Sequence, residues 1–179
     1  MPEMHDTVIV GGGQAGLAMS YHLRQRGREH VILERRRVAE RWRTERWDSL
    51  RLQFSNNWLE LPGRPYMGTD PDVFAHSSDV VRFIVDYAAE IEAPVHTGVE
   101  VTSLSPSEGN GGYAIEITNG PINAQHVVIA TGPFQRPLIP DFGRAIPLVV
   151  YQTDTSHYRN AAELPPGSVL VVGTGNSGC

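Results

Sequence analysis

A glycine-rich hexapeptide near the start of the chain constrains the fold more than any other feature of the sequence. It has the pattern G-x-G-x-x-G, in which the first glycine makes a tight turn, the second admits a pyrophosphate and the third lets a helix pack on a strand. The apolar residues 7–10 predict a β-strand before it, and the spacing of apolar residues across 14–26 predicts a helix that Gly27 ends. The hexapeptide consists of Gly11, Gly12, Gly13, Gln14, Ala15 and Gly16.

A second apolar stretch, residues 30–34, ends in an acid and completes a strand–helix–strand unit of about 30 residues. Such a unit predicts a parallel sheet, with a pyrophosphate on the helix N-terminus. Glu34 follows the turn by about 20 residues, where a carboxylate accepts hydrogen bonds from an adenosine ribose and repels a 2′-phosphate. The site therefore favours FAD or NAD over NADP, and the turn alone leaves FAD and NAD open. The alternatives are a glycine turn that only packs and a solvated Glu34.

The next part of the chain contains few regular elements before one clear helix. An arginine- and tryptophan-rich stretch covers 35–51, and a proline- and glycine-rich loop covers 56–74. Apolar residues at helical spacing then predict an amphipathic helix over 79–91, capped by Ser77 or Ser78.

A group of short strands follows and predicts a small antiparallel insertion in the parallel sheet. We expect strands at 94–97, 100–104 and 113–118, the last joined by a turn at 119–120 to a returning strand. The apolar run 126–130 then returns to the parallel sheet. The fold class is therefore α/β, with a Rossmann-like parallel sheet and a small antiparallel excursion.

The glycine pattern occurs a second time at the end of the chain. A proline-punctuated crossover at 133–147 leads to the apolar run 168–172, which predicts a strand. A second dinucleotide-binding turn is therefore expected after it. The turn contains Gly173, Gly175, Asn176, Ser177 and Gly178.

Composition and charge exclude several functional classes. The net charge of -5 gives no basic surface for nucleic acid, and no apolar run approaches the ~18 residues that span a membrane. The residues 1–6 are too short and polar for a secretory signal, so we expect a cytoplasmic protein. Cys179 is the only cysteine, which excludes an internal disulfide, a CxxC pair and a cysteine-based zinc site.

The remaining residue types argue against other chemistries. All 15 basic residues are arginine, so neither a Schiff-base lysine nor a P-loop lysine is available. The seven histidines are scattered, with no pair at metal-ligand spacing, and we expect no metal site. Redox chemistry would therefore have to come from a cofactor.

Seven segments of the chain together resemble the flavin-dependent monooxygenase superfamily, which includes the flavin-containing and Baeyer–Villiger monooxygenases. The resemblance is strongest to bacterial members described as FAD-dependent oxidoreductases, and it covers essentially the whole chain. It selects FAD over NAD for the first site. The matching segments are 8–16, 31–35, 40–43, 47–52, 61–63, 127–132 and 169–178.

The resemblance implies further cofactor-binding residues outside the glycine turns. Arg41 and Trp42 would lie beside the flavin, and Gln53 stands where relatives carry an asparagine or histidine facing the isoalloxazine ring. Thr131 would approach the FAD phosphates, and Val101 would offer backbone groups to the adenine. The implied set is completed by Arg35, after the acidic strand end, and by Ala130 and Gly132, which flank Thr131.

Three departures from the family pattern stand out. Ala39 replaces a glycine that is usual in relatives, and Asp154 replaces the histidine of a His-Ser pair. The Baeyer–Villiger signature F-x-G-x-x-x-H-x-x-x-W is absent, which disfavours that subtype. Neither Asp48 nor Asp154 has a partner that can be identified from the sequence.

The resemblance also implies an organisation and a reaction. Residues 1–166 would form an FAD-binding domain that lacks its C-terminal return segment, and 167–179 would begin an NAD(P)H-binding domain. NADPH or NADH would reduce FAD by hydride transfer, and reaction with oxygen would give a C4a-(hydro)peroxyflavin that oxygenates a small molecule. No side chain is then required as a nucleophile or base, so no catalytic residue is predicted. The alternatives are a thioredoxin-reductase-like flavoprotein and a non-catalytic nucleotide-binding module.

Overall fold

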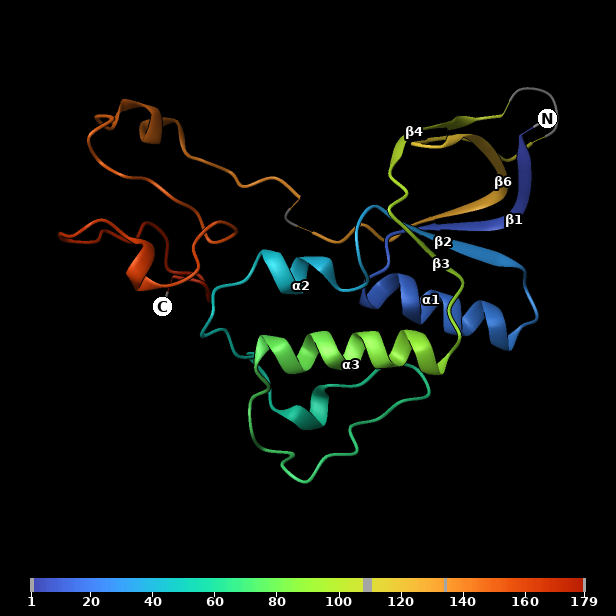
Figure 1. The fold of residues 1–179 in the computed structure, drawn as a ribbon, viewed down its shortest axis with the longest axis horizontal. Helices are drawn as coiled ribbons and strands as arrows, with labels where there is room; N and C mark the ends of the chain where they lie inside the picture. The colour runs from blue at the N-terminus through green and yellow to red at the C-terminus, as the bar shows by residue number, and fades with distance from the viewer. Residues whose placement is uncertain (1, 108–110, 134, 179) are drawn as a thin grey trace.

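The computed structural model describes residues 2–107, 111–133 and 135–178. Its strands form one six-stranded sheet. β1 (Glu3–Val10) lies in its middle, with β2 (His30–Glu34) and β6 (Gly120–Ile129) parallel to it on either side. The strand order is β3-β2-β1-β6-β5-β4, and α1 (Gln14–Gln25) connects β1 to β2 (Figure 1). The α/β class with its parallel strand–helix–strand unit is confirmed.

The antiparallel insertion is confirmed in part, with two corrections: the strand expected in it at 94–97 belongs to the parallel part of the sheet, and two expected strands are one. β3 (Val95–Thr97) adds to β2 in parallel, while β4 (Val101–Pro106) and β5 (Tyr113–Ile117) pair antiparallel. The returning strand and the run 126–130 were expected as separate strands, but they form the single strand β6. The reason is that β6 pairs with β5 through its first half and with β1 through most of its length. The backbone therefore stays extended between the two expected strands.

The helices include one that the sequence did not predict and one that starts earlier than expected. α2 (Glu40–Thr44) lies within the stretch that was expected to be irregular. α3 (Ser77–Glu90) begins two residues before its predicted start, and His76 is its N-cap rather than either serine. The Asp79 carboxylate, in the first turn, accepts a hydrogen bond from the His76 backbone N–H at 3.3 Å and so fixes this start. Short 3-10 helices span Asn56–Trp58, Asp141–Ala145 and Ala161–Glu163.

The sheet buries a different apolar cluster on each face, because successive residues of a strand point to opposite sides. On one face Ile9 packs with residues of α1 and α3, including Leu17 and Ile84. On the other face Val8 packs with Ile115 and other residues of the antiparallel strands. All five of these side chains are fully buried, so the core fixes both the sheet and the helices on it.

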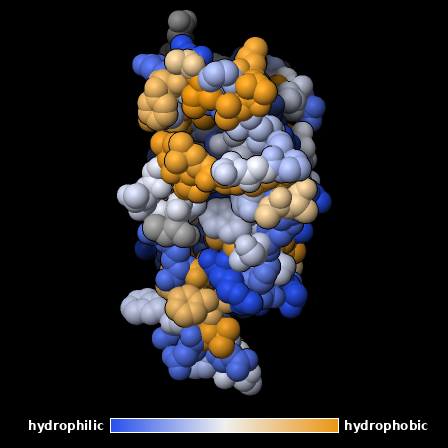
Figure 2. Space-filling view, turned by 90° about the vertical axis from the view of Figure 1, so that its left-hand side faces the viewer, coloured by the Kyte–Doolittle hydropathy of each residue, from blue (hydrophilic) through white to orange (hydrophobic). Residues whose placement is uncertain are grey.

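Residues 135–178 run outside this core as an extended segment without strands (Figure 1). The predicted strand at 168–172 is wrong: the segment forms no β-ladder, and Leu170 is 85% exposed. A strand needs a partner for its backbone groups, and none of the described strands lies beside this segment. Figure 2, seen from the side of this segment, shows apolar side chains gathered in patches at the surface. No helix in the described part of the chain is long and apolar enough to cross a membrane.

Tyr87 ties α3 to the proline- and glycine-rich loop. Its side chain is fully buried, and its hydroxyl donates a hydrogen bond of 2.7 Å to the carbonyl oxygen of Pro62. Burial raises the pKa of Tyr87 to about 12, and the nearby Tyr21 and Glu90 add to the shift. The neutral hydroxyl is therefore the form that the fold stabilises.

We predict that Tyr87→Phe lowers the free energy of unfolding by about 1 kcal/mol, the usual net value of a hydrogen bond. Because the folded-state pKa is raised, the stabilisation by Tyr87 is fully present below its ordinary pKa and is lost as the pH rises through about 12. Urea unfolding between neutral and alkaline pH would measure both effects. Tyr113→Phe, at an exposed tyrosine, is the control, and equal losses in the two variants would contradict the assignment.

Candidate nucleotide-binding site

The first glycine turn joins β1 to α1, and its first and third glycines are required by the backbone itself. The N–H of Gly11 donates to the carbonyl of Leu33 at 2.8 Å, and its φ of +114° suits only glycine. A Cβ at Gly11 would lie 2.5 Å from the Ala130 oxygen, and one at Gly16 would lie 2.0 Å from the Gly11 oxygen. No larger residue fits either position without moving the chain.

The second glycine of the pattern, Gly13, is different. A Cβ built there meets no atom within 4 Å, and its φ of -95° is open to any residue. Gly13 is the N-cap of α1, whose first turn receives no side-chain cap. Free N–H groups at a helix N-terminus attract anions. The fold therefore leaves open space at the position where a pyrophosphate would need it.

Glu34 ends β2 and holds the glycine turn in place. Its Oε2 accepts the Gly12 N–H at 2.8 Å, and its Oε1 accepts the Arg36 N–H at 2.9 Å. The sequence predicted a role for this carboxylate toward a ribose, but it gave no sign of the bond to the turn. Each carboxylate oxygen can accept more than one hydrogen bond, so both roles are compatible.

The end of β6 meets the glycine turn from the other side. The Ala130 N–H donates to the Val10 carbonyl at 2.8 Å, which brings Thr131 and Gly132 beside the turn. Thr131 is exposed, and Gly132 has a φ of +79°. The structure thus brings the turn, Glu34 and the 130–132 segment together at the carboxyl edge of the parallel strands, where ligands bind in open α/β sheets.

α2 approaches the same edge through Arg41. The Arg41 guanidinium donates to the Pro133 carbonyl oxygen and also pairs with Glu45. Trp42 packs against the core, and the Arg46 guanidinium lies 5.0 Å from its ring centroid. Burial lowers the pKa of Arg46, and the positive charge of Arg41 lowers it further. This concentration of positive charge suits an anionic ligand.

The helix begins at a strained residue. Ala39, the N-cap of α2, has a left-handed φ of +61° and is buried. This conformation costs an L-residue about 1–2 kcal/mol and is one that glycine adopts without strain.

The other predicted residues lie further from the first turn. Arg35 is exposed just after β2. Val101 begins β4 opposite Ile117, shortly after the Val99 N–H donates to the carbonyl of Glu34 at 3.0 Å. Val101 therefore lies shortly after the residue whose backbone bonds to Glu34 at the end of β2.

Gln53 does not reach the first turn but contacts the second one. The side-chain oxygen of Gln53 accepts a hydrogen bond of 2.7 Å from Nδ2 of Asn176. This places the second glycine turn beside the residue that the sequence predicted to face the flavin. No feature of the sequence indicated this contact.

The second turn reproduces the geometry of the first without a strand before it or a helix after it. Gly173 has a φ of +115°, close to the +114° of Gly11. A Cβ at Gly178 would lie 2.4 Å from the Gly173 oxygen, and one at Gly175 would meet no atom within 4 Å. Ser177 and Gly178 are exposed. The positive φ at the first glycine, the open space at the second and the close carbonyl oxygen at the third thus recur in the same order.

Two aspartates without a predicted partner have one in the structure. Asp48 accepts a hydrogen bond of 2.7 Å from Nδ2 of Asn160, and Asp154 pairs with His157 at 2.7 Å. Burial alone would raise the pKa of Asp154, but hydrogen bonds from His157 and from the Ser156 backbone hold it below its ordinary value. Within the described residues, no three His, Cys, Asp or Glu side chains are placed to hold a metal, and Cys179 lies outside them.

One depression in the surface lies away from both glycine turns. It measures about 420 Å³ and lies between the loop around Asn56 and α3. Among the described residues, the buried side-chain oxygen of Asn56 has no hydrogen-bond partner. The nucleotide site is therefore identified by its backbone geometry and not by the size of a cavity.

Comparison with known proteins agrees with this geometry. A family model described as pyridine nucleotide-disulphide oxidoreductase matches residues 8–179. An uncharacterized CzcO-like oxidoreductase of Geobacillus kaustophilus is 41% identical over 99% of this chain and 50% of its own length. An indole-3-pyruvate monooxygenase of Oryza sativa, YUCCA1, is 31% identical over 96% of this chain and 42% of its own length. The chain thus spans about half the length of the curated relatives it matches.

Solved structures give the same result. A flavin monooxygenase from Stenotrophomonas maltophilia, solved as a double mutant, superposes with a TM-score of 0.84 at 28% identity. The superposition covers 98% of this chain and 53% of that one. A bacillithiol disulfide reductase from Staphylococcus aureus shares only the fold, with a TM-score of 0.65 at 18% identity. With a family match that runs from the first strand through both glycine turns, the chain belongs to the pyridine nucleotide-disulphide oxidoreductase family and has the Rossmann-like fold of the flavin monooxygenases.

Proposed function

We propose that this chain is the flavin-binding part of an NAD(P)H-dependent flavoprotein monooxygenase. The observation that carries the proposal is the open space over Gly13, at the uncapped N-terminus of α1 and between Glu34 and the 130–132 segment. An extended dinucleotide fits this arrangement, because its pyrophosphate and its ribose need different groups at a fixed separation.

Each end of the AMP half of FAD has a residue to hold it. The N–H groups of the first turn of α1 would bind the pyrophosphate, since Gly13 leaves them accessible. The Glu34 carboxylate would accept the ribose hydroxyls while keeping its bond to Gly12. Thr131, exposed beside the turn, would donate its hydroxyl to a phosphate oxygen.

The flavin half would lie toward α2, where Arg41 reaches the segment after β6. FAD, when bound, supplies hydride acceptance and reaction with oxygen, and the protein orients it and limits access of water. Trp42 and Arg41 would fix the ring position. The names of the relatives support this reading, since they include an indole-3-pyruvate monooxygenase and a flavin monooxygenase.

NADPH or NADH would bind at the second glycine turn and reduce the flavin by hydride transfer. Support comes from the matched geometry of Gly173, Gly175 and Gly178, and from the contact between Asn176 and Gln53. A thioredoxin-reductase-like reaction is disfavoured, because a CxxC pair is absent from this sequence. The exposed run 168–172 favours a second candidate, a nucleotide-binding module that is not catalytic in this form.

We predict that Glu34→Ala weakens FAD binding by about 1–3 kcal/mol, because a charged hydrogen-bond acceptor is lost. Glu34→Gln keeps an acceptor for the Gly12 N–H and should lose less affinity. Flavin fluorescence titration of the two variants beside the parent would give the dissociation constants. Unchanged FAD affinity in Glu34→Ala would overturn the ribose assignment.

We predict that Gly13→Val abolishes FAD binding and leaves the far-UV circular dichroism unchanged. A side chain at Gly13 meets no protein atom within 4 Å, so it would fill the pyrophosphate position without disturbing the fold. Gly175→Val is the matched control, since Gly175 has the same open surroundings in the second turn. Tight FAD binding by Gly13→Val, or equal loss in both variants, would refute the placement.

We predict that the 179-residue chain binds FAD weakly, is not reduced by NAD(P)H and tends to associate. The run 168–172 exposes apolar side chains and forms no β-ladder, and such segments pair with other chains. Anaerobic flavin absorbance with NADPH and with NADH, together with light scattering, would measure both properties. Rapid saturable reduction in a monodisperse sample would exclude the non-catalytic form and contradict this prediction.

A further inference from the structure

Residues 154–160 form a turn that is stiffened by its own hydrogen bonds. The Asp154 carboxylate accepts the Ser156 N–H at 2.8 Å, and the Asp154 carbonyl accepts the Tyr158 N–H at 2.9 Å. The Arg159 guanidinium donates to the carbonyls of Ser156 and Tyr158 at 2.9 and 3.1 Å. These bonds close the turn on itself.

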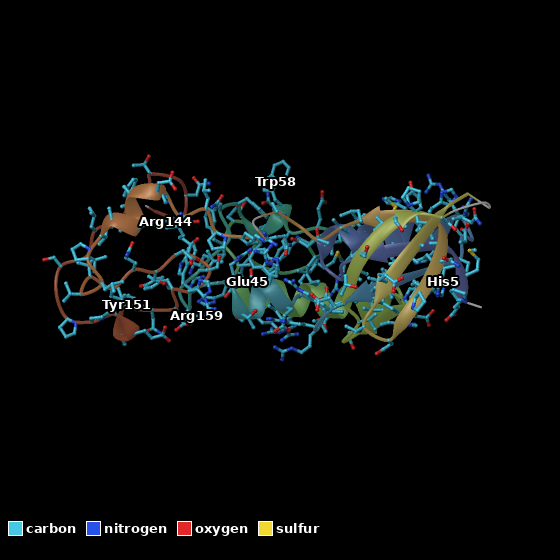
Figure 3. All side chains as sticks on the ribbon, turned by 90° about the horizontal axis from the view of Figure 1, so that it is seen from above. His5, Glu45, Trp58, Arg144, Tyr151 and Arg159 are labelled. Carbon is cyan, nitrogen blue, oxygen red and sulfur yellow. The ribbon has the colours of Figure 1, made fainter. Side chains whose placement is uncertain are left out.

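This turn docks on the chain that follows α2. The Asp48 N–H donates to the Arg159 carbonyl at 2.9 Å, and the Asp48 carboxylate accepts Nδ2 of Asn160 at 2.7 Å. Arg159 also reaches the Arg46 carbonyl at 3.4 Å. Figure 3 shows Arg159 where the C-terminal segment meets the part of the molecule around Glu45. Asp48 therefore makes two of the three contacts in what we call the connector clasp, formed by Arg46, Asp48, Arg159 and Asn160.

A second attachment lies a few residues further along residues 46–53, which we call the strip. Gln53 accepts the hydrogen bond from Asn176, so residues 46–53 hold the segment 154–178 at two separate points. Two points of attachment define an orientation, whereas one point leaves rotation free. The run 168–172 between them forms no β-ladder, so it adds no pairing with the sheet to these contacts.

The strip 46–53 is also tied to the flavin side of the molecule. It follows α2 directly, and Arg46 stacks on the ring of Trp42. The clasp thus joins the element proposed to hold the flavin to the segment that leads toward the turn proposed to hold NAD(P)H, and the Gln53–Asn176 bond holds that turn itself. Hydride transfer needs reacting atoms about 3–3.5 Å apart, so the relative position of the two nucleotides has to be fixed closely.

We infer that Asp48 is a positioning residue, which through Asn160 holds the second glycine turn against the flavin-binding part. The inference rests on the proposed function, which assigns the two nucleotides that have to be positioned. The bond between Asp48 and Asn160 does not itself require FAD. Asp48 does not touch either glycine turn, so it acts only through the docked segment.

Hydrogen exchange of the whole chain, followed by mass spectrometry, tests the inference. Asp48→Ala should speed exchange about tenfold in 154–160 and in 173–178, because the side-chain bond to Asn160 is lost while the backbone bond to Arg159 remains. Exchange in β1 and α1 and the affinity for FAD should stay unchanged. Asp48→Asn keeps an acceptor for Asn160 and should restore the parent pattern. Because Asn160 also caps the 3-10 helix at 161–163 through the Ala162 N–H, Asp48→Ala with Asn160→Ala should be no worse than Asn160→Ala alone.

Asp72→Ala, at an exposed aspartate in the loop, is the matched control and should change none of these readings. Unchanged exchange at 173–178 in Asp48→Ala would overturn the positioning role, as would failure of Asp48→Asn to restore it. A uniform rise in exchange throughout the chain would also overturn it, since that is general destabilisation. Failure of the parent chain to bind FAD would instead refute the proposed function and leave the exchange result standing.

Discussion

The close approach of three backbone segments at the carboxyl end of β1 is the constraint on which the rest of the structure depends. Gly11 lies against the carbonyl of Ala130, and Gly16 lies against the carbonyl of Gly11. Only residues without a Cβ permit these distances, and the result is that α1 starts directly over the edge of the sheet. The bond from the Gly12 N–H to Glu34 then fixes the turn to β2.

From this junction the candidate site extends toward the proposed ribose position and toward the proposed flavin position. Different contacts hold the two parts in place. Toward the ribose it rests on Glu34, at the end of a buried strand whose register is set by pairing with β1. Toward the flavin it rests on α2, a five-residue helix that starts from the strained Ala39 and is joined to the segment after β6 by Arg41. The first support is part of the core, while the second depends on side-chain contacts made across the chain.

The second glycine turn has local order outside the sheet. Its backbone matches the first turn, yet the run before it is exposed and outside the sheet. It is held by Asn176 on Gln53 and by the connector clasp, which are contacts of single side chains and single backbone groups. Such contacts orient a segment but contribute far less stability than a buried core, so this part of the chain depends on the strip 46–53 for its position.

The sequence by itself determined the features whose cause is local. Both glycine turns follow from the six-residue glycine pattern, whose first glycine adopts a positive φ, and β1, α1 and β2 follow from the periodicity of apolar residues. Tertiary structure decided whatever needs a distant partner. The union of two expected strands into β6 and the exposure of 168–172 each depended on which groups were available to pair. The bond between Glu34 and Gly12 and that between Asp48 and Asn160 join residues far apart in the chain, and no short pattern encodes such a meeting.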